Sequence, residues 1–287
     1  MILIQHLTAW STTLVAYLVL MSCTDTVDAF GMSTSRFIMK APKDKQKPSL
    51  ILISGSPGTG KSTFAMSVAL DQGILKCIST DTIRATMRSF VSPDISPALH
   101  RSSFAEAFEG DDPVRSWRET CSVLLPSVEG LIADAIKRGT SIVVEGVHVV
   151  PHNEFIHKWE EAGGVAVGVL LQVRNEEKHK RQLRKRGVMT GVVEAEEAKI
   201  AAFDRIRAIQ EEMMRLAKEN HWIQIEQRTA PDPLDLVESA LSGDASFAEM
   251  FIKQEKDEKH DHHGKKQKTV KLNDDHVNGR VSTCTKE

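Results

Sequence analysis

The sequence predicts an α/β fold, a doubly wound αβα sandwich around a mainly parallel five-stranded sheet. Short apolar runs alternate with longer segments of helical periodicity, which is typical of strands buried between two layers of helices. The first apolar run ends in Gly55-Ser-Pro-Gly-Thr-Gly-Lys-Ser62, the G-x-x-x-x-G-K-[ST] pattern of a phosphate-binding loop, and a helix-forming run follows at once. Together these observations indicate a P-loop NTPase fold, in which right-handed crossovers place helices on both faces of the sheet.

Length and composition favour one domain of ordinary size between two peripheral segments. Among the 287 residues we expect a targeting leader and linker over 1–48, a P-loop domain over 49–245 and a charged tail over 246–287. The net charge of −2 provides no overall field that would favour nucleic acid. The cysteines contain no C-x-x-C pair, which argues against a disulfide framework or a zinc site; they are Cys23, Cys77, Cys121 and Cys284.

The leader has the composition of an address sequence. The apolar block Leu14–Met21 is too short to span a bilayer and suits the core of a signal peptide, with Val27-Asp28-Ala29 as its exit. A basic, hydroxylated stretch without acidic residues, Phe30–Lys43, follows it, as in transit peptides. The Ala29–Phe30 junction resembles the bipartite plastid presequence of diatoms and related algae. We therefore expect a plastid location and no stable membrane association after removal of the leader; the alternatives are secretion and an uncleaved membrane anchor.

The elements follow from local signals, taken in chain order. The predicted strands are 50–54, 76–79, 141–145, 165–173 and 221–225. The predicted helices are 61–72, 81–90, 119–138, 153–162, 175–186, 194–219 and 234–241. Gly139 and Gly187 are expected to end the helices before them, while Asn153 and Asn175 are expected to cap the helices after them. Pro126 is expected to kink its helix or to mark its true start.

The phosphate-binding loop is predicted to hold ATP together with Mg²⁺. Its residues are Gly55, Ser56, Pro57, Gly58, Thr59, Gly60, Lys61, Ser62 and Thr63. Glycines let the backbone approach a phosphate chain closely, and the first amides of the following helix point at the anion with the helix dipole behind them. Lys61 is expected to reach the β- and γ-phosphates, and the hydroxyl of Ser62 is expected to ligate Mg²⁺.

Polar residues also follow two later strands at their carboxyl ends, where open α/β sheets bind ligands. Asp81 is expected to orient or deprotonate an acceptor hydroxyl, and Arg84 to grip a carboxylate or phosphate of the acceptor; the alternative is a helix-capping Asp81 beside a solvated Arg84. Glu145, which ends the third strand, is expected to hold Mg²⁺ through water. His148 follows in the loop, where it either touches the acceptor or packs in the core.

The basic helix over 175–186 is expected to act as a lid, with Arg181 and Arg184 stabilising charge on the phosphoryl group in transfer. The alternative is a solvated basic helix. A nucleic-acid surface is disfavoured because no aromatic residues are interleaved with the charges. The tail histidines, His260, His262 and His263, are close enough in sequence for metal capture, although a solvated polar run is the favoured interpretation.

Four stretches resemble the 2-phosphoglycerate kinases of methanogenic archaea and their eukaryotic relatives. They are the phosphate-binding loop, Ile78–Arg88, Ser92–Ser103 and Ile142–Pro151. The resemblance implies ATP as donor, the phosphorylated acid 2-phosphoglycerate as acceptor and 2,3-bisphosphoglycerate as product. It also implies that the insertion at 92–103 covers the acceptor and places near its phosphate four side chains, those of His100, Arg101, Ser102 and Ser103.

The residues alone leave two other functions open. One is a kinase for a different acceptor, such as a nucleotide, an RNA end or a sugar, and the other is a nucleotide-binding regulator without transfer activity. Intact Lys61, Asp81 and Glu145 speak against the regulator, because a protein that only binds nucleotide needs no acid on the acceptor side. We expect a small-molecule partner and no nucleic acid, and the sequence does not indicate the oligomeric state.

Overall fold

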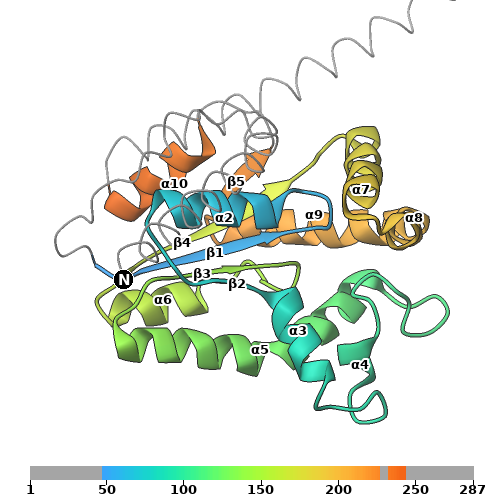
Figure 1. Ribbon diagram of the computed structural model, residues 1–287, viewed down its shortest axis with the longest axis horizontal. Coiled ribbons are helices and arrows are strands. Elements are labelled where there is room, and N and C mark those ends of the chain that lie inside the picture. Colours follow the sequence, from blue (N-terminus) through green and yellow to red (C-terminus); the bar gives the residue numbers. More distant parts are fainter. Residues whose placement is uncertain (1–46, 227–231, 244–287) are drawn as a thin grey trace, which may run out of the picture. The chain divides into compact units, whose positions relative to one another are not determined.

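In a computed structural model, residues 47–226 and 232–243 are described, and they form a sheet with helices on both faces (Figure 1). All of the predicted leader except residues 47 and 48 lies outside the described residues. The predicted tail over 246–287, with its three histidines, also lies outside them. Within the described part of the chain, no helix is both long and apolar enough to cross a membrane.

The sheet has five strands in the order β2-β3-β1-β4-β5, and every neighbouring pair is parallel. The strands are β1 (Ser49–Gly55), β2 (Cys77–Ser79), β3 (Ile142–Glu145), β4 (Val165–Gln172) and β5 (Ile223–Glu226). In the central strand, Ile53 of β1 pairs with Glu145 of β3, and Gly55 pairs with Leu171 of β4. Parallel pairing brings all five carboxyl ends, and the polar residues after them, to one edge of the sheet. The predicted α/β sandwich is confirmed.

Helices cover both faces because the connections between parallel strands pass through them. On one face lie α2 (Lys61–Asp71) and α10 (Pro233–Ser242) (Figure 1). On the other face lie α5 (Pro113–Arg138), α6 (Glu154–Glu161) and α9 (Phe203–Glu219). The remaining helices gather at the carboxyl edge of the sheet; they are α3 (Thr80–Arg88), α4 (Pro97–His100), α7 (Glu176–Thr190) and α8 (Val193–Ala201).

The core lies between the sheet and these helices. Every residue of β1 is buried, as expected for a central strand covered on both faces. Three tryptophans, Trp117, Trp159 and Trp222, are almost wholly buried, and each indole N–H has an acceptor, as buried indoles require. The acceptors are the carbonyls of Val147 and Pro48 and the side-chain oxygen of Asn153. The interior between the sheet and these helices is therefore packed, and its buried indole donors are hydrogen-bonded.

Two helix boundaries on the side of α5 and α9 differ from the prediction. Helix α5 begins at Pro113 rather than at residue 119, because Pro113 suits a first helical position and Asp112 accepts a hydrogen bond from the Val114 amide. The helix then continues through Pro126, which does not mark its start. The long helix predicted over 194–219 is two helices, α8 and α9, separated at Ala202.

Gly187 does not end the basic helix. Helix α7 continues to Thr190, and Gly191 closes it with φ +70°. Gly187 is instead a packing residue, because a Cβ at this position would lie 3.2 Å from Cβ and Cγ of Glu196 in α8. The missing side chain thus lets two helices approach closely.

The two predicted asparagine caps behave differently. Asn175 caps α7 as predicted, since its side chain accepts a hydrogen bond from the Lys178 amide at 2.8 Å. Asn153 stands at the start of α6 but caps nothing there. Its side chain accepts from Trp222 and donates to the Asn220 carbonyl, so tertiary contacts have replaced the local one.

Candidate functional site

The loop between β1 and α2 has a backbone that only glycine adopts readily. The φ angles are +150° at Gly55, +77° at Gly58 and +86° at Gly60. A Cβ at Gly55 would collide with the Leu171 carbonyl of β4, and one at Gly58 would lie 2.8 Å from a methyl carbon of Leu183 in α7. Gly60 caps α2 without a side-chain hydrogen bond, which leaves the amides of the first turn available to an anion. The loop therefore fits a phosphate chain.

Lys61, Ser62 and Glu145 meet where β1 and β3 end side by side. The Ser62 hydroxyl donates to Oε1 of Glu145 at 3.1 Å, and the Lys61 ammonium donates to the Ser56 carbonyl at 2.9 Å. Burial lowers the pKa of Lys61 to about 8, while the negative charges of Glu145 and Asp81 oppose this shift. A hydroxyl oxygen next to a carboxylate oxygen is a donor set that suits Mg²⁺. The residues at this position therefore fit the metal that the motif predicts.

Asp81 faces the same lysine from the start of α3. Ser79 is the capping residue of this helix, since its hydroxyl accepts from the Asp81 amide, so the Asp81 carboxylate is not used as the cap. The Asp81 side chain is 70% exposed, and its charge acts on Lys61. Gly146, with φ +149°, lets the start of α3 lie close to the end of β3, because a Cβ at this position would overlap the Thr80 hydroxyl. A carboxylate open to solvent thus acts on Lys61, and its Oδ1 lies 3.7 Å from Nδ1 of His148.

His148 is buried and engaged at both ring nitrogens. Nδ1 lies 3.1 Å from the Thr80 hydroxyl, and Nε2 lies 2.7 Å from the Ser103 hydroxyl. Burial lowers the pKa of His148 to about 4, which keeps the imidazole neutral at physiological pH. The geometry matches the packing alternative, in which His148 joins the loop after β3 to the segment that carries Ser103.

That segment, residues 89–112 between α3 and α5, is called the cap below. Arg84 holds it in place, since its three guanidinium nitrogens donate to the Leu99 carbonyl at 2.9 Å, to the Ser103 hydroxyl at 3.2 Å and to the Arg101 carbonyl. Arg84 is only 7% exposed. The alternative of a solvated Arg84 is therefore wrong, because the cap surrounds the guanidinium and supplies its acceptors. The prediction that Arg84 grips the acceptor stays a prediction.

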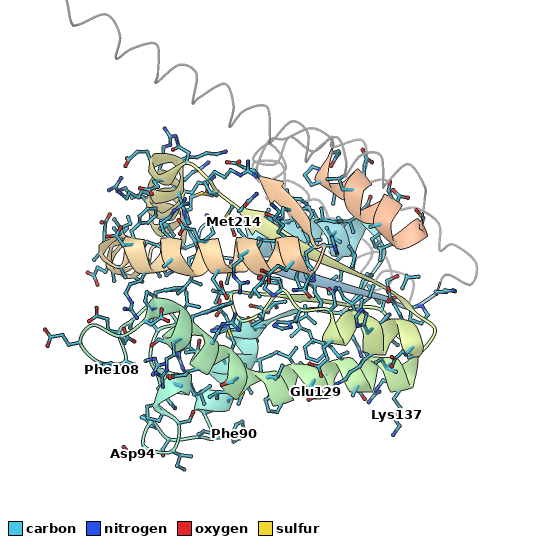
Figure 2. The ribbon with its side chains drawn as sticks, turned by 180° about the vertical axis from the view of Figure 1, so that it is seen from behind. Phe90, Asp94, Phe108, Glu129, Lys137 and Met214 are labelled. Atoms are coloured by element: carbon cyan, nitrogen blue, oxygen red, sulfur yellow. The ribbon has the colours of Figure 1, made fainter. Side chains whose placement is uncertain are left out.

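The other cap residues that the resemblance placed near the acceptor point in different directions. His100 donates a ring N–H to the Val91 carbonyl at 2.7 Å, and Arg101 pairs with Glu119 of α5 at 2.7 Å. Ser103 is buried against His148, whereas Ser102 is exposed. Phe90, Asp94 and Phe108 lie at the outer edge of the cap (Figure 2). Of the side chains of His100, Arg101, Ser102 and Ser103, that of Ser103 forms hydrogen bonds with His148 and Arg84.

Helix α9 holds the cap and the phosphate-binding loop at once. Arg205 pairs with the buried Asp111 at 2.7 Å and donates to the Phe104 carbonyl at 2.9 Å. Hydrogen bonds from Ser116 and from the Ala107 amide, together with Arg205, lower the pKa of Asp111 to about 2.

Five residues further along α9, the side chain of Gln210 accepts from the Ser56 hydroxyl at 2.8 Å and donates to the Val173 carbonyl at 3.0 Å. Sequence analysis missed Arg205, Asp111 and Gln210. No local pattern marks them, because Arg205 is 101 residues from Phe104 and Gln210 is 154 residues from Ser56.

Helix α7 lies directly on the loop. His179, also missed, donates from Nε2 to the Pro57 carbonyl at 2.6 Å, and Leu183 packs on Gly58. The predicted lid arginines, Arg181 and Arg184, are exposed, and Arg184 lies 3.9 Å from Glu197. The cations whose charges lower the pKa of Lys61 include two others, Arg186 of α7 and Lys199 of α8. Helix α7 thus lies where the lid was predicted. The cations that act on Lys61 include Arg186 and Lys199, which were not predicted.

Strand order, glycine loop and the Lys61 cluster define the class: a P-loop protein built to hold a nucleotide phosphate chain. Residues 50–213, more than half of the chain, match the family model described as AAA domain. The chain therefore belongs to this family of P-loop domains.

Curated relatives named 2-phosphoglycerate kinase are similar to it. One from Methanocaldococcus jannaschii is 34% identical over 178 residues, which cover 60% of this chain and 56% of that protein. One from Methanopyrus kandleri is 30% identical over 207 residues, 70% of this chain and 62% of that protein. The predicted resemblance to that family is confirmed, although the chain spans less than two thirds of the length of these relatives.

Among solved structures, a shikimate kinase from Acinetobacter baumannii aligns at TM-score 0.40 and 14% identity, over 69% of this chain and 95% of its own. That alignment is too loose to add to the fold that the strand order already defines.

Proposed function

We propose that this protein is an ATP-dependent kinase that transfers the γ-phosphoryl group to the free hydroxyl of 2-phosphoglycerate. The observation that carries the proposal is the grouping around Lys61: the hydrogen-bonded Ser62–Glu145 pair, and the solvent-exposed carboxylate of Asp81, whose charge also acts on Lys61. A protein that only binds nucleotide has no need of the second carboxylate. The relatives named 2-phosphoglycerate kinase support the choice of acceptor.

The donor side binds and orients the triphosphate. The loop amides and the Lys61 ammonium take up negative charge on the β- and γ-phosphates, and Gln210 and His179 hold the loop in its binding shape from behind. The Ser62 hydroxyl and the Glu145 carboxylate would hold Mg²⁺. When bound, Mg²⁺ neutralises charge on the phosphate oxygens during transfer.

The acceptor side supplies a base and a closed compartment. Asp81 accepts the proton of the acceptor hydroxyl as the hydroxyl oxygen bonds to the γ-phosphorus; the bond from that phosphorus to the β–γ bridging oxygen breaks, and ADP leaves. The products are ADP and 2,3-bisphosphoglycerate, so the phosphoryl group moves without loss. Arg84, His148 and Arg205 keep the cap over this side, which limits access of water as a competing acceptor.

The experiment measures ADP release by the purified full chain with ATP, Mg²⁺ and a panel of acceptors. The panel contains 2-phosphoglycerate, 3-phosphoglycerate, glycerate, a nucleoside monophosphate and a sugar, with phosphorus NMR to identify the product. We expect 2-phosphoglycerate to stimulate ADP release most, with a product that carries two phosphate esters. Stimulation by a nucleotide or sugar alone would assign a different acceptor, and ATP binding without stimulation by any acceptor would overturn the kinase.

A further inference from the structure

Glu196 is a buried carboxylate in a helix that is otherwise mostly exposed. It is 1% exposed, although charged side chains are rarely buried unless they are paired. Its Oε1 lies 2.6 Å from the ammonium of Lys199 and 3.6 Å from Nε of Arg186, while its Oε2 has no hydrogen-bond partner among the described residues. One carboxylate oxygen therefore holds two cations from two helices.

Packing fixes this carboxylate in position. Cβ and Cγ of Glu196 lie against Gly187 of α7, where a side chain of any other residue would push the two helices apart. The helices lie next to each other at the carboxyl edge of the sheet (Figure 1). Because packing fixes Cβ and Cγ of Glu196, its carboxylate has a fixed position. The carboxylate keeps the charged groups of Arg186 and Lys199 together, although the two cations repel each other.

That place is beside the phosphate-binding loop. Leu183 covers Gly58, and Arg186 lies three residues further along α7, about 4.5 Å along the helix axis. Lys199 is held at the same part of α7, because its ammonium lies 2.6 Å from the Glu196 carboxylate that packs on Gly187, and the charges of both cations act on Lys61. Neither Arg186 nor Lys199 is buried, and both therefore have a side open to a ligand.

We propose that Glu196 is a positioning residue that holds Arg186 and Lys199 together beside the phosphate-binding loop, where the two cations contact the terminal phosphate of a nucleoside triphosphate. This deepens the proposed function, on which it rests for the identity of the nucleotide. It also replaces Arg181 and Arg184 with Arg186 and Lys199 as the lid cations. The three side chains together carry one net positive charge, which attracts the terminal phosphate.

The test compares the affinities of the full chain for ADP and for a non-hydrolysable ATP analogue, each with Mg²⁺, by calorimetry. We expect Arg186→Gln and Lys199→Gln to weaken binding of the triphosphate about tenfold, the effect of one lost charge-assisted hydrogen bond, and to leave ADP affinity unchanged. Glu196→Gln should weaken triphosphate binding in the same selective way. The matched control is Glu197→Gln, an exposed neighbour on the same helix, which should change neither affinity.

A double variant separates positioning from general packing. If Glu196 acts through Lys199, adding Glu196→Gln to Lys199→Gln should cost less than the two single effects combined. Thermal melting of each variant shows whether it is folded; if Glu196→Gln does not fold, the two cation variants decide the matter alone.

The proposal is overturned if a folded Glu196→Gln keeps the wild-type preference for triphosphate, or if Arg184→Gln removes it while Arg186→Gln does not. Equal losses for ADP and triphosphate would likewise overturn it, because they indicate damage to the loop. The assay contains no acceptor. A failure of the kinase proposal therefore shows as missing transfer and leaves this binding result intact.

Discussion

The phosphate-binding loop and the cap lie at the same edge of the sheet, but they are held in different ways. The loop depends mainly on its own backbone, three glycines with positive φ and the start of α2 within nine residues, with Gln210 and His179 as added supports. The cap depends on side chains from outside it: Arg84 of α3, His148 of the loop after β3 and Arg205 of α9. Local chain stiffness therefore shapes the donor side, whereas buried polar contacts between remote segments shape the acceptor side.

The loop and the cap should therefore respond differently to substitutions. A change in the loop should act on phosphate chemistry and leave the acceptor compartment in place. A change in a cap support should act on acceptor binding and spare the nucleotide. Helix α9 is the element where the two regions meet, because Arg205 binds the cap and Gln210 binds the loop.

Lys61→Ala should lower the rate of ADP release about 100- to 1,000-fold, since it removes a cation aimed at the transferring phosphate. Its melting temperature should not fall, because burial lowers the pKa of Lys61 and its removal relieves a desolvation cost. Steady-state turnover and thermal melting check both statements. Lys76→Ala, at a partly exposed lysine far from the loop in sequence, is the control and should keep full turnover. An equal loss of turnover in Lys61→Ala and Lys76→Ala would contradict the role proposed for Lys61.

Glu145→Gln should raise the Mg²⁺ concentration needed for half-maximal turnover about 10- to 100-fold, because an amide is a weaker metal ligand than a carboxylate. The fold should persist, since the amide oxygen still accepts from Ser62. A Mg²⁺ titration of turnover measures this, with the exposed Glu161→Gln as control. An unchanged Mg²⁺ requirement in Glu145→Gln would place the metal elsewhere.

Asp111→Asn should raise KM for the acceptor about five- to tenfold and leave KM for ATP unchanged, because it removes the charge that ties the cap to Arg205. Asp112→Asn is the neighbouring control, and it should have no effect because asparagine also caps α5. Both constants come from initial rates with one substrate varied at a time. A joint rise of the two KM values would show that cap and loop are not separately held.

Folding stability should fall in acid through His148. Its pKa is about 4 in the folded protein, against an ordinary value of 6.5, so between these values the unfolded chain binds a proton that the folded chain does not. The stabilisation is complete above pH 6.5 and is lost as the pH falls toward 4. Burial is the main cause, opposed by the charge of Asp81 and reinforced by Arg84, Lys61 and Arg88.

Urea unfolding at pH 7 and pH 5 measures this effect. His148→Gln should lose less stability than the wild type between the two pH values, and the exposed His157→Gln should follow the wild type. A wild type and a His148→Gln variant with the same pH dependence would show that His148 does not provide this acid sensitivity.

Much of the fold and the donor side was predictable because the signals lie close together in the sequence. The loop glycines, Lys61, Ser62 and the strand that ends in Glu145 were each marked by neighbouring residues, and the structure brings them together. Helix ends were less certain. Glycine commonly ends helices, but Gly187 instead packs against Glu196 of the next helix. The residues next to Gly187 in the sequence do not reveal this contact.

The residues themselves determined the alternation of strands and helices, the backbone of the phosphate-binding loop and the class of ligand it holds, because hydrophobic periodicity and glycine φ angles act over a few residues. Only the tertiary structure decided that Arg84 holds the cap, that His148 is a buried neutral link, and that Arg186 and Lys199 meet at Glu196. The physical reason is that a buried polar group takes whichever partner the folded chain brings within hydrogen-bond reach, and that partner can be more than 100 residues away.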